Sequence, residues 1–225
     1  MQDFRRYAVY WVPPGDWAEA AAHWLGWDPL KGVELALPAL GTALDGWTEE
    51  PRKYGFHGTI KAPFRLAHGW DQVRLSDGLE ALCAGLAPTV LPGLALRRIG
   101  AFLALTAQGD AAALMAPAAE VVGGLDAARA PLTAAEVQRR RPERLTPGQR
   151  ALLDRWGYPY VIGEFQFHLM LSGRLAAADP DRMQPVAKAY FAPHLPRPFV
   201  LGDLCLFAEA LDGRFHLIRR YPLAG

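Results

Sequence analysis

A strict alternation of apolar and polar side chains, EFQFHLMLS at residues 164–172, constrains the fold more than any other stretch of this chain. Successive side chains of a β-strand point to opposite faces, so a period of two predicts a strand with one buried face. We expect this strand to cover residues 161–173. The even-numbered positions form its polar face, which Met170 alone interrupts: Glu164, Gln166, His168, Met170 and Ser172. His168 is therefore expected to face away from the core.

A second histidine lies on a strand of similar form. The stretch YGFHGTIKAPF predicts a strand over residues 55–62, and its parity groups His57, Thr59 and Lys61 on one face. His57 and His168 are 168 − 57 = 111 residues apart, about half of the 225-residue chain. This spacing is typical of two similar lobes that face each other across a groove.

The remaining pattern predicts an α+β fold with antiparallel sheets. Strands are expected at residues 5–13, 94–107 (two strands around Gly100), 199–210 and 214–223, the last two joined by an Asp-Gly hairpin turn. Helices are expected at residues 16–25 (capped by Asp16), 70–86, 110–126 (interrupted by Pro117) and 181–191. Capping boxes predict two more, at Thr133 with Glu136 and at Thr146 with Gln149. Residues 26–51 are expected to form a long irregular loop.

Composition narrows the chemistry. A formal charge of +1 argues against a generally basic, nucleic-acid-coating surface. Cys83 and Cys205 stand alone in apolar runs and are expected to be buried thiols. The chain has no GxSxG, GxxxxGK[ST], GxGxxG or HExxH motif. The first apolar run is too short for a signal peptide, and no stretch approaches the ~20 apolar residues that cross a bilayer. We therefore expect a cytoplasmic protein that does not bind membranes.

Several stretches resemble one known family. Two histidine strands about a hundred residues apart are similar to the signature of the 2H phosphoesterase superfamily, which includes RNA 2′,3′-cyclic phosphodiesterases and LigT-like enzymes. The stretches RRYAVYWVPP, PRKYGFHGTIKAPFRLA, RAPLT, WGYPYV, EFQFHLMLSGRL and RRYPL look closest to the DUF1045 branch, which is associated with phosphonate-utilisation operons. The resemblance implies one bilobal domain over residues 1–225. In it, two pseudo-symmetric antiparallel sheets face a central groove, with helices outside.

The resemblance also implies a chemistry. It is metal-independent hydrolysis of a cyclic phosphodiester on a small nucleotide or phosphorylated sugar, with no cofactor. His57 and His168 would be the general acid and base. Thr59 would donate a hydrogen bond to a phosphate oxygen. Lys61 would add a cation, and Ser172 would supply the second hydroxyl.

One departure from the family pattern concerns the second motif. Met170 stands where the family has Thr or Ser, and Ser172 lies about 7 Å further along the strand at ~3.3 Å per residue. A rival hypothesis is therefore a phosphate-ligand or nucleotide-binding protein of the same fold with weakened or lost turnover. A metallohydrolase is a second rival, although the motifs supply no carboxylate or third histidine at ligand spacing.

The remaining candidates are interpreted as structural. The arginines of residues 139–144 are expected to form a solvated helix end rather than a phosphate site. Core packing is preferred to a ligand-binding wall for four tyrosines: Tyr7, Tyr10, Tyr158 and Tyr160. Surface or structural roles are expected for the other histidines: His23, His68, His194 and His216. The expected partner is a small phosphorylated substrate, a cyclic nucleotide or ribosyl cyclic phosphate, with an RNA end as a further candidate. The sequence does not fix the oligomeric state, and a monomer is favoured.

Overall fold

The computed structural model describes residues 4–41 and 43–225. Residues 1–3, at the start of the amino-terminal run, and Thr42, in the expected loop, lie outside the described residues. Within the described part, seven strands form one antiparallel sheet in the order β11-β10-β1-β4-β8-β7-β6. Their bounds are β1 Arg6–Trp11, β4 Gly58–Phe64, β6 Leu94–Ile99, β7 Phe102–Ala107, β8 His168–Met170, β10 Asp203–Glu209 and β11 Phe215–Pro222.

The α+β class with antiparallel strands is confirmed, but the expectation of two separate sheets is wrong. The sheet consists of two groups of strands, β11-β10-β1-β4 and β8-β7-β6. They are joined where β4 pairs with β8, and this pairing consists of one residue pair, Gly58 with Leu169. The close approach there depends on glycine. A Cβ on Gly58 would lie 2.4 Å from the Phe167 ring, so a larger residue would push this ring out of its place.

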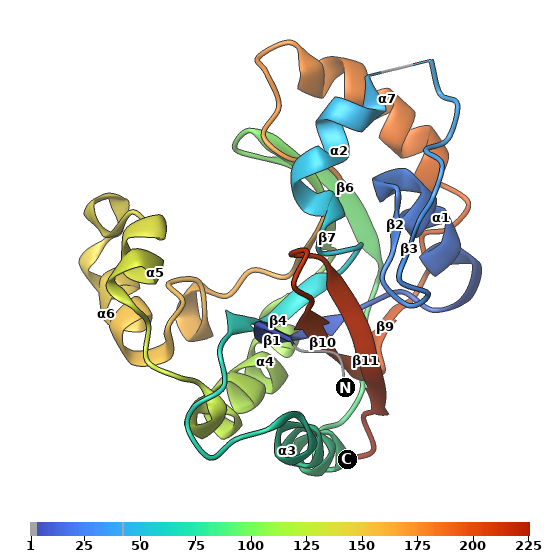
Figure 1. Ribbon diagram of the computed structural model, residues 1–225. Coiled ribbons are helices and arrows are strands. Elements are labelled where there is room, and N and C mark those ends of the chain that lie inside the picture. The colour runs from blue at the N-terminus through green and yellow to red at the C-terminus, as the bar shows by residue number, and fades with distance from the viewer. Residues whose placement is uncertain (1–3, 42) are drawn as a thin grey trace.

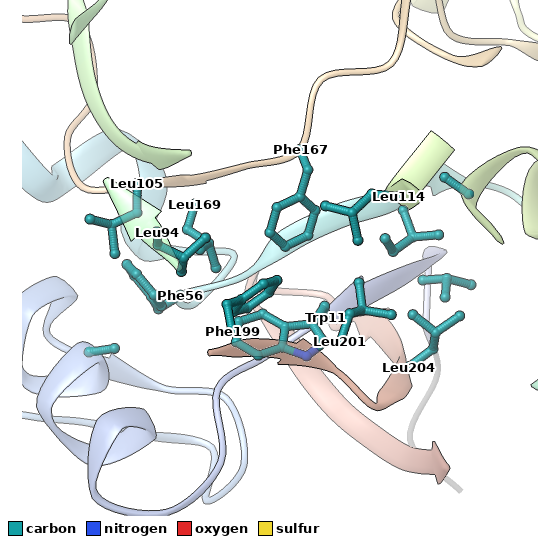
Figure 2. Close-up of a cluster of buried hydrophobic side chains, with 14 of the residues drawn as sticks. Trp11, Phe56, Leu94, Leu105, Leu114, Phe167, Leu169, Phe199, Leu201 and Leu204 are labelled. Carbon is teal, nitrogen blue, oxygen red and sulfur yellow. The ribbon is translucent and has the colours of Figure 1, made fainter. Parts of the chain in front are cut away.

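One face of the sheet carries the main hydrophobic core (Figure 2). Phe167 packs against Trp11 and Phe199, with ring centroids 6.2 and 5.7 Å apart. Helices cover this face with their apolar sides, because each helix has an amphipathic stripe that must leave water. Buried members of the core come from five helices: α1 Gly15–Leu25, α2 Leu44–Arg52, α3 Gln72–Ala84, α4 Ala112–Gly124 and α7 Asp179–Phe191.

The helix predictions hold in outline and fail in detail. Asp16 lies in the first turn of α1 and does not cap it; the N-cap position is Pro14. Pro117 does not interrupt α4, because the buried face of the helix, which includes Val121, holds it together across the proline. Both capping boxes are confirmed, at α5 Ala134–Arg139 and α6 Pro147–Trp156.

The expected loop at residues 26–51 contains more structure than predicted: a short hairpin, β2 Trp27–Asp28 with β3 Val33–Glu34, and helix α2 Leu44–Arg52. Of the strand expected at residues 161–173, only β8 forms, and a 3₁₀ turn, η3 Ile162–Glu164, precedes it. The segment 199–210 divides at Gly202. Its first part is β9 Phe199–Leu201, which pairs with β5 Thr89–Leu91, and its second part is β10.

The sheet's other face carries a smaller apolar cluster around Tyr10, Phe207 and Phe215. Helices α5 and α6 lie to one side of the strands, away from α1, α2 and α7 (Figure 1).

The remaining short 3₁₀ helices are η1 Asp126–Ala128 and η2 Pro142–Arg144. Cys83 and Cys205 are buried free thiols, as expected. Among the helices described, none has the length and apolar character needed to cross a bilayer.

Candidate active site

His57 and His168 line the same cavity, which has a volume of about 570 Å³. Each histidine stands one position before a member of the Gly58–Leu169 pair that joins β4 and β8. In an antiparallel pair this places the two residues diagonally on one face, at a separation of about 7–8 Å between backbones. The polar faces of the two predicted strands therefore meet.

The two imidazoles are held in the same way. Nδ1 of His57 lies 2.8 Å from the carbonyl oxygen of Gly55, and Nδ1 of His168 lies 2.8 Å from that of Gln166. A carbonyl oxygen can only accept, so each Nδ1 carries a hydrogen and donates it to the residue two positions earlier. In the neutral rings Nε2 is then the basic atom. The repeated local bond fixes the same tautomer in both histidines.

His57 is in a more apolar setting than its place in a cavity suggests. Its ring stacks on Tyr10 with centroids 3.8 Å apart and planes at 29°. Burial lowers the pKa of His57 to about 4; the Gly55 carbonyl opposes this effect, and the charge of His168 adds to it. His57 is therefore neutral at pH 7 in the unliganded protein.

Thr59 is the hydroxyl residue that the structure brings to the histidines. It lines the cavity, and its Oγ1 lies 3.2 Å from Nε2 of His57. Because Nε2 is the unprotonated nitrogen, the threonine hydroxyl donates this hydrogen bond. Met170 also lines the cavity, from β8, and places a thioether where the sequence resemblance predicted a hydroxyl.

Lys61 does not share a face with His57, contrary to expectation. Thr59 pairs with Tyr10 of β1, whereas Lys61 pairs with Val9, because β4 holds an extra residue between them. This bulge reverses the alternation and turns Lys61 toward the core. Its Nζ donates a 3.0 Å hydrogen bond to the carbonyl of Val122, and burial lowers the pKa of Lys61 to about 8.

Ser172 is likewise absent from the cavity lining. Its side chain is fully buried, accepts a 3.0 Å hydrogen bond from the backbone N–H of Leu103 and donates to the carbonyl of Gly173. The strand parity that predicted its position ends with β8 at Met170, so Ser172 follows a different backbone direction.

Aromatic residues form much of the cavity wall. Tyr158 and Tyr160 line it, which corrects the preference for core packing at these two positions. Tyr10 also lines the cavity but is buried in the smaller apolar cluster, and Tyr7 belongs to the main core, so core packing is confirmed for both. Tyr54 is a lining residue that the sequence analysis missed, although it is the first letter of the first histidine motif. Burial raises the pKa of Tyr158 and, more strongly, that of Tyr10.

Two of the arginines interpreted as a solvated helix end, Arg139 and Arg140, also line the cavity. They stand at the end of α5, and the loop after α6 brings Tyr158 beside them: the Arg140 guanidinium lies over its ring, 4.8 Å from the centroid. No local sequence signal marks this approach, because the segments come from different turns of the chain.

Within residues 4–41 and 43–225, no group of three or more histidine, cysteine, aspartate and glutamate side chains is arranged to hold a metal ion.

A family model described as "Protein of unknown function (DUF1045)" matches residues 59–216. Two curated relatives carry the name "Ribose 1,5-bisphosphate phosphokinase PhnN". The protein from Janthinobacterium sp. (strain Marseille) is 35% identical over 235 residues, which cover 100% of this chain and 52% of the relative. The protein from Laribacter hongkongensis (strain HLHK9) is 32% identical over 227 residues, which cover 95% and 51%. The chain thus spans about half the length of these relatives.

Solved structures with a similar fold include E. coli LigT complexed with 3′-AMP, with a TM-score of 0.45 and 12% identity over 99% of this chain and 100% of LigT. TT0787 of Thermus thermophilus gives a TM-score of 0.49 and 15% identity over 98% of each chain.

Proposed function

Because this chain belongs to the DUF1045 family and directs two identically held imidazoles into one cavity, we propose that it is a metal-independent phosphoesterase. The proposed reaction is the hydrolysis of a cyclic phosphodiester on a small nucleotide or phosphorylated sugar. The matched pair of histidines is the observation that carries the proposal. Each ring has its Nδ1–H on a carbonyl and its Nε2 left for chemistry.

In this reaction water attacks phosphorus while Nε2 of one histidine takes its proton. The P–O bond to one ring oxygen breaks, and the second histidine, protonated at Nε2, gives that oxygen a proton. The product is a phosphomonoester beside a free hydroxyl, and one proton has moved from one imidazole to the other. We assign the base role to His57, because it is neutral at pH 7.

A pKa of about 4 would make His57 a weak base, but the substrate itself corrects this. A phosphodiester carries a negative charge, and a negative charge beside an imidazole raises its pKa. The bound anion therefore strengthens His57 as a base, and His168 supplies the proton to the leaving oxygen.

Thr59 is the proposed donor to a non-bridging phosphate oxygen. Its hydroxyl already lies within reach of Nε2 of His57 and can turn to an anion bound there. Lys61 and Ser172 have no part in this mechanism, because both side chains are engaged in the interior.

The name of the curated relatives concerns ribose bisphosphate chemistry in proteins about twice as long as the matched region. This chain has no GxxxxGK[ST] loop, the usual site for nucleotide phosphates. We therefore do not assign the named kinase activity to this chain. The name supports a phosphorylated ribose as the substrate class. Together with the phosphonate association of the DUF1045 branch, it supports a role for the proposed reaction in phosphonate metabolism.

One observation favours a second candidate, a binding protein without turnover. Met170 lines the cavity and offers no hydroxyl to a phosphate oxygen. Such a protein would hold a phosphorylated ligand between the same two histidines.

An assay with nucleoside 2′,3′-cyclic phosphates in excess EDTA separates these candidates. Turnover by the unchanged protein, reduced ~10²–10⁴-fold in His57→Ala and His168→Ala, is expected. His68→Ala is the matched control, because His68 is exposed and outside the cavity. Ligand binding without product would favour the binding protein. Activity lost in EDTA and restored by zinc or manganese would replace the mechanism with a metal-dependent one.

A further inference from the structure

The cavity lining contains two adjacent arginines, Arg139 and Arg140, in addition to the histidines that would face the phosphodiester. Arg6 also lines the cavity but is neutralised by Glu209, whose carboxylate accepts from Nε and Nη2 at 2.5 and 2.7 Å. Within the described part of the chain, no carboxylate oxygen lies within 4.0 Å of the guanidinium nitrogens of Arg139 or Arg140. A pair of adjacent arginines facing a cavity without a carboxylate partner is typical of an anion site.

None of the acidic residues of the lining forms an ion pair with Arg139 or Arg140. Glu136 is held by Arg65, and Glu164 accepts from the side chain of Gln149 at 3.1 Å. Glu50 accepts from the backbone N–H of Arg174 and packs against Gly173, at the α2 end of the lining.

Arg140 is oriented by an aromatic ring rather than by a hydrogen bond. Its guanidinium lies over Tyr158, 4.8 Å from the centroid. Stacking uses the flat face of the group and leaves its N–H donors for an acceptor in the plane. The residues described here supply none within hydrogen-bonding distance of the Arg140 side chain.

The short helix α5 that carries the arginines is tied to the catalytic strand. Arg65, directly after β4, makes a forked ion pair with Glu136 of α5, with both N–O distances 3.0 Å. A further bond from Arg65 reaches the carbonyl of Pro131 at 2.6 Å. This clamp fixes the arginines relative to Thr59 and His57, so two anions of one ligand could be held at a defined separation.

Aromatic side chains connect the two ends. Tyr54 lies beside His57, with ring centroids 5.9 Å apart, and Tyr158, on whose ring the Arg140 guanidinium rests, lines the same cavity. Apolar walls with a few placed charges are typical of sites for small organic ligands, and the volume of about 570 Å³ is in their usual range.

We propose that Arg139 and Arg140 bind a second phosphate group of the substrate, a phosphomonoester on the same sugar that carries the cyclic diester. The substrate class is therefore a sugar phosphate with two phosphate groups, rather than a simple nucleoside cyclic phosphate. This inference rests on the proposed function for the reaction at the diester end. The monoester fits a pair of guanidinium groups because its oxygens accept several charge-assisted hydrogen bonds.

The test compares two substrates that differ by one group: adenosine 2′,3′-cyclic phosphate with and without a 5′-phosphate. The 5′-phosphorylated form should have a kcat/KM at least ~10-fold higher, mainly through KM, since charge-assisted hydrogen bonds are about twice as strong as neutral ones. In Arg139→Gln and Arg140→Gln this preference should fall toward one. Arg144→Gln is the matched control, because it removes a charge from the same segment outside the cavity.

A binding experiment keeps the two proposals separate. Calorimetry with adenosine 2′-phosphate and adenosine 2′,5′-bisphosphate needs no turnover. An arginine-dependent preference for the bisphosphate in a protein that hydrolyses nothing would refute the hydrolase and support the second phosphate site. Equal affinities, or a preference that survives both substitutions, would overturn the site. So would a preference for RNA ends with a terminal cyclic phosphate over the bisphosphorylated mononucleotide.

Discussion

Acidification from pH 7 to pH 5 should destabilise the folded protein through His57. Its folded pKa is about 4, whereas an imidazole in the unfolded chain titrates near 6.5. Between these values the unfolded chain binds more protons, so the contribution to stability is intact above about pH 6.5 and is lost as the pH falls toward 4. Linkage gives a loss of about 2 kcal/mol between pH 7 and pH 5.

Urea unfolding at the two pH values measures this loss, with His57→Asn as the test variant. The asparagine amide can donate to the Gly55 carbonyl as Nδ1 does, so the local bond is kept while the titrating group is removed. The variant should lose about 2 kcal/mol less than the unchanged protein over this range. His168→Asn is the control. It should lose about as much stability as the unchanged protein, because burial, and not His168, is the main cause of the low pKa of His57.

Equal losses in the unchanged protein and in His57→Asn would refute this reasoning. They would mean that water solvates the His57 ring fully, and the assignment of His57 as the neutral base would lose its support.

Three further substitutions test the site's surroundings. Gly58→Ala should destabilise the protein by about 1–3 kcal/mol in urea unfolding and lower activity, because the new methyl group displaces Phe167 at the junction of β4 and β8; an unchanged midpoint would contradict this. Ser172→Ala should cost about 1–3 kcal/mol, since the Leu103 N–H loses its acceptor, and should leave KM unaltered; a raised KM would return Ser172 to the site. Met170→Thr should raise kcat/KM at least ~10-fold by supplying a second hydroxyl donor; unchanged kinetics would exclude a hydroxyl at this position from the mechanism.

Local patterns predicted the parts of the site that depend on short stretches of chain. The capping boxes of α5 and α6 formed as expected, because the bonds of a cap lie within four residues. The parity of EFQFHLMLS put His168 and Met170 on the cavity side, because strand alternation is a local rule. Where the backbone departs from regular geometry, the same rule failed. The bulge in β4 inverted Lys61, and the early end of β8 removed Ser172.

The amino-acid sequence by itself pointed to the residues that we propose for the chemistry: two histidines, each beginning or preceding a short strand and each two positions after the carbonyl that orients it. The tertiary structure decided what surrounds them. It joined the two strand groups into one sheet, stacked Tyr10 on His57 and brought Arg139 and Arg140 to the same cavity. Alternation and capping arise from neighbours along the chain, whereas burial, pKa shifts and charge pairing arise from residues that are distant in sequence and close in space.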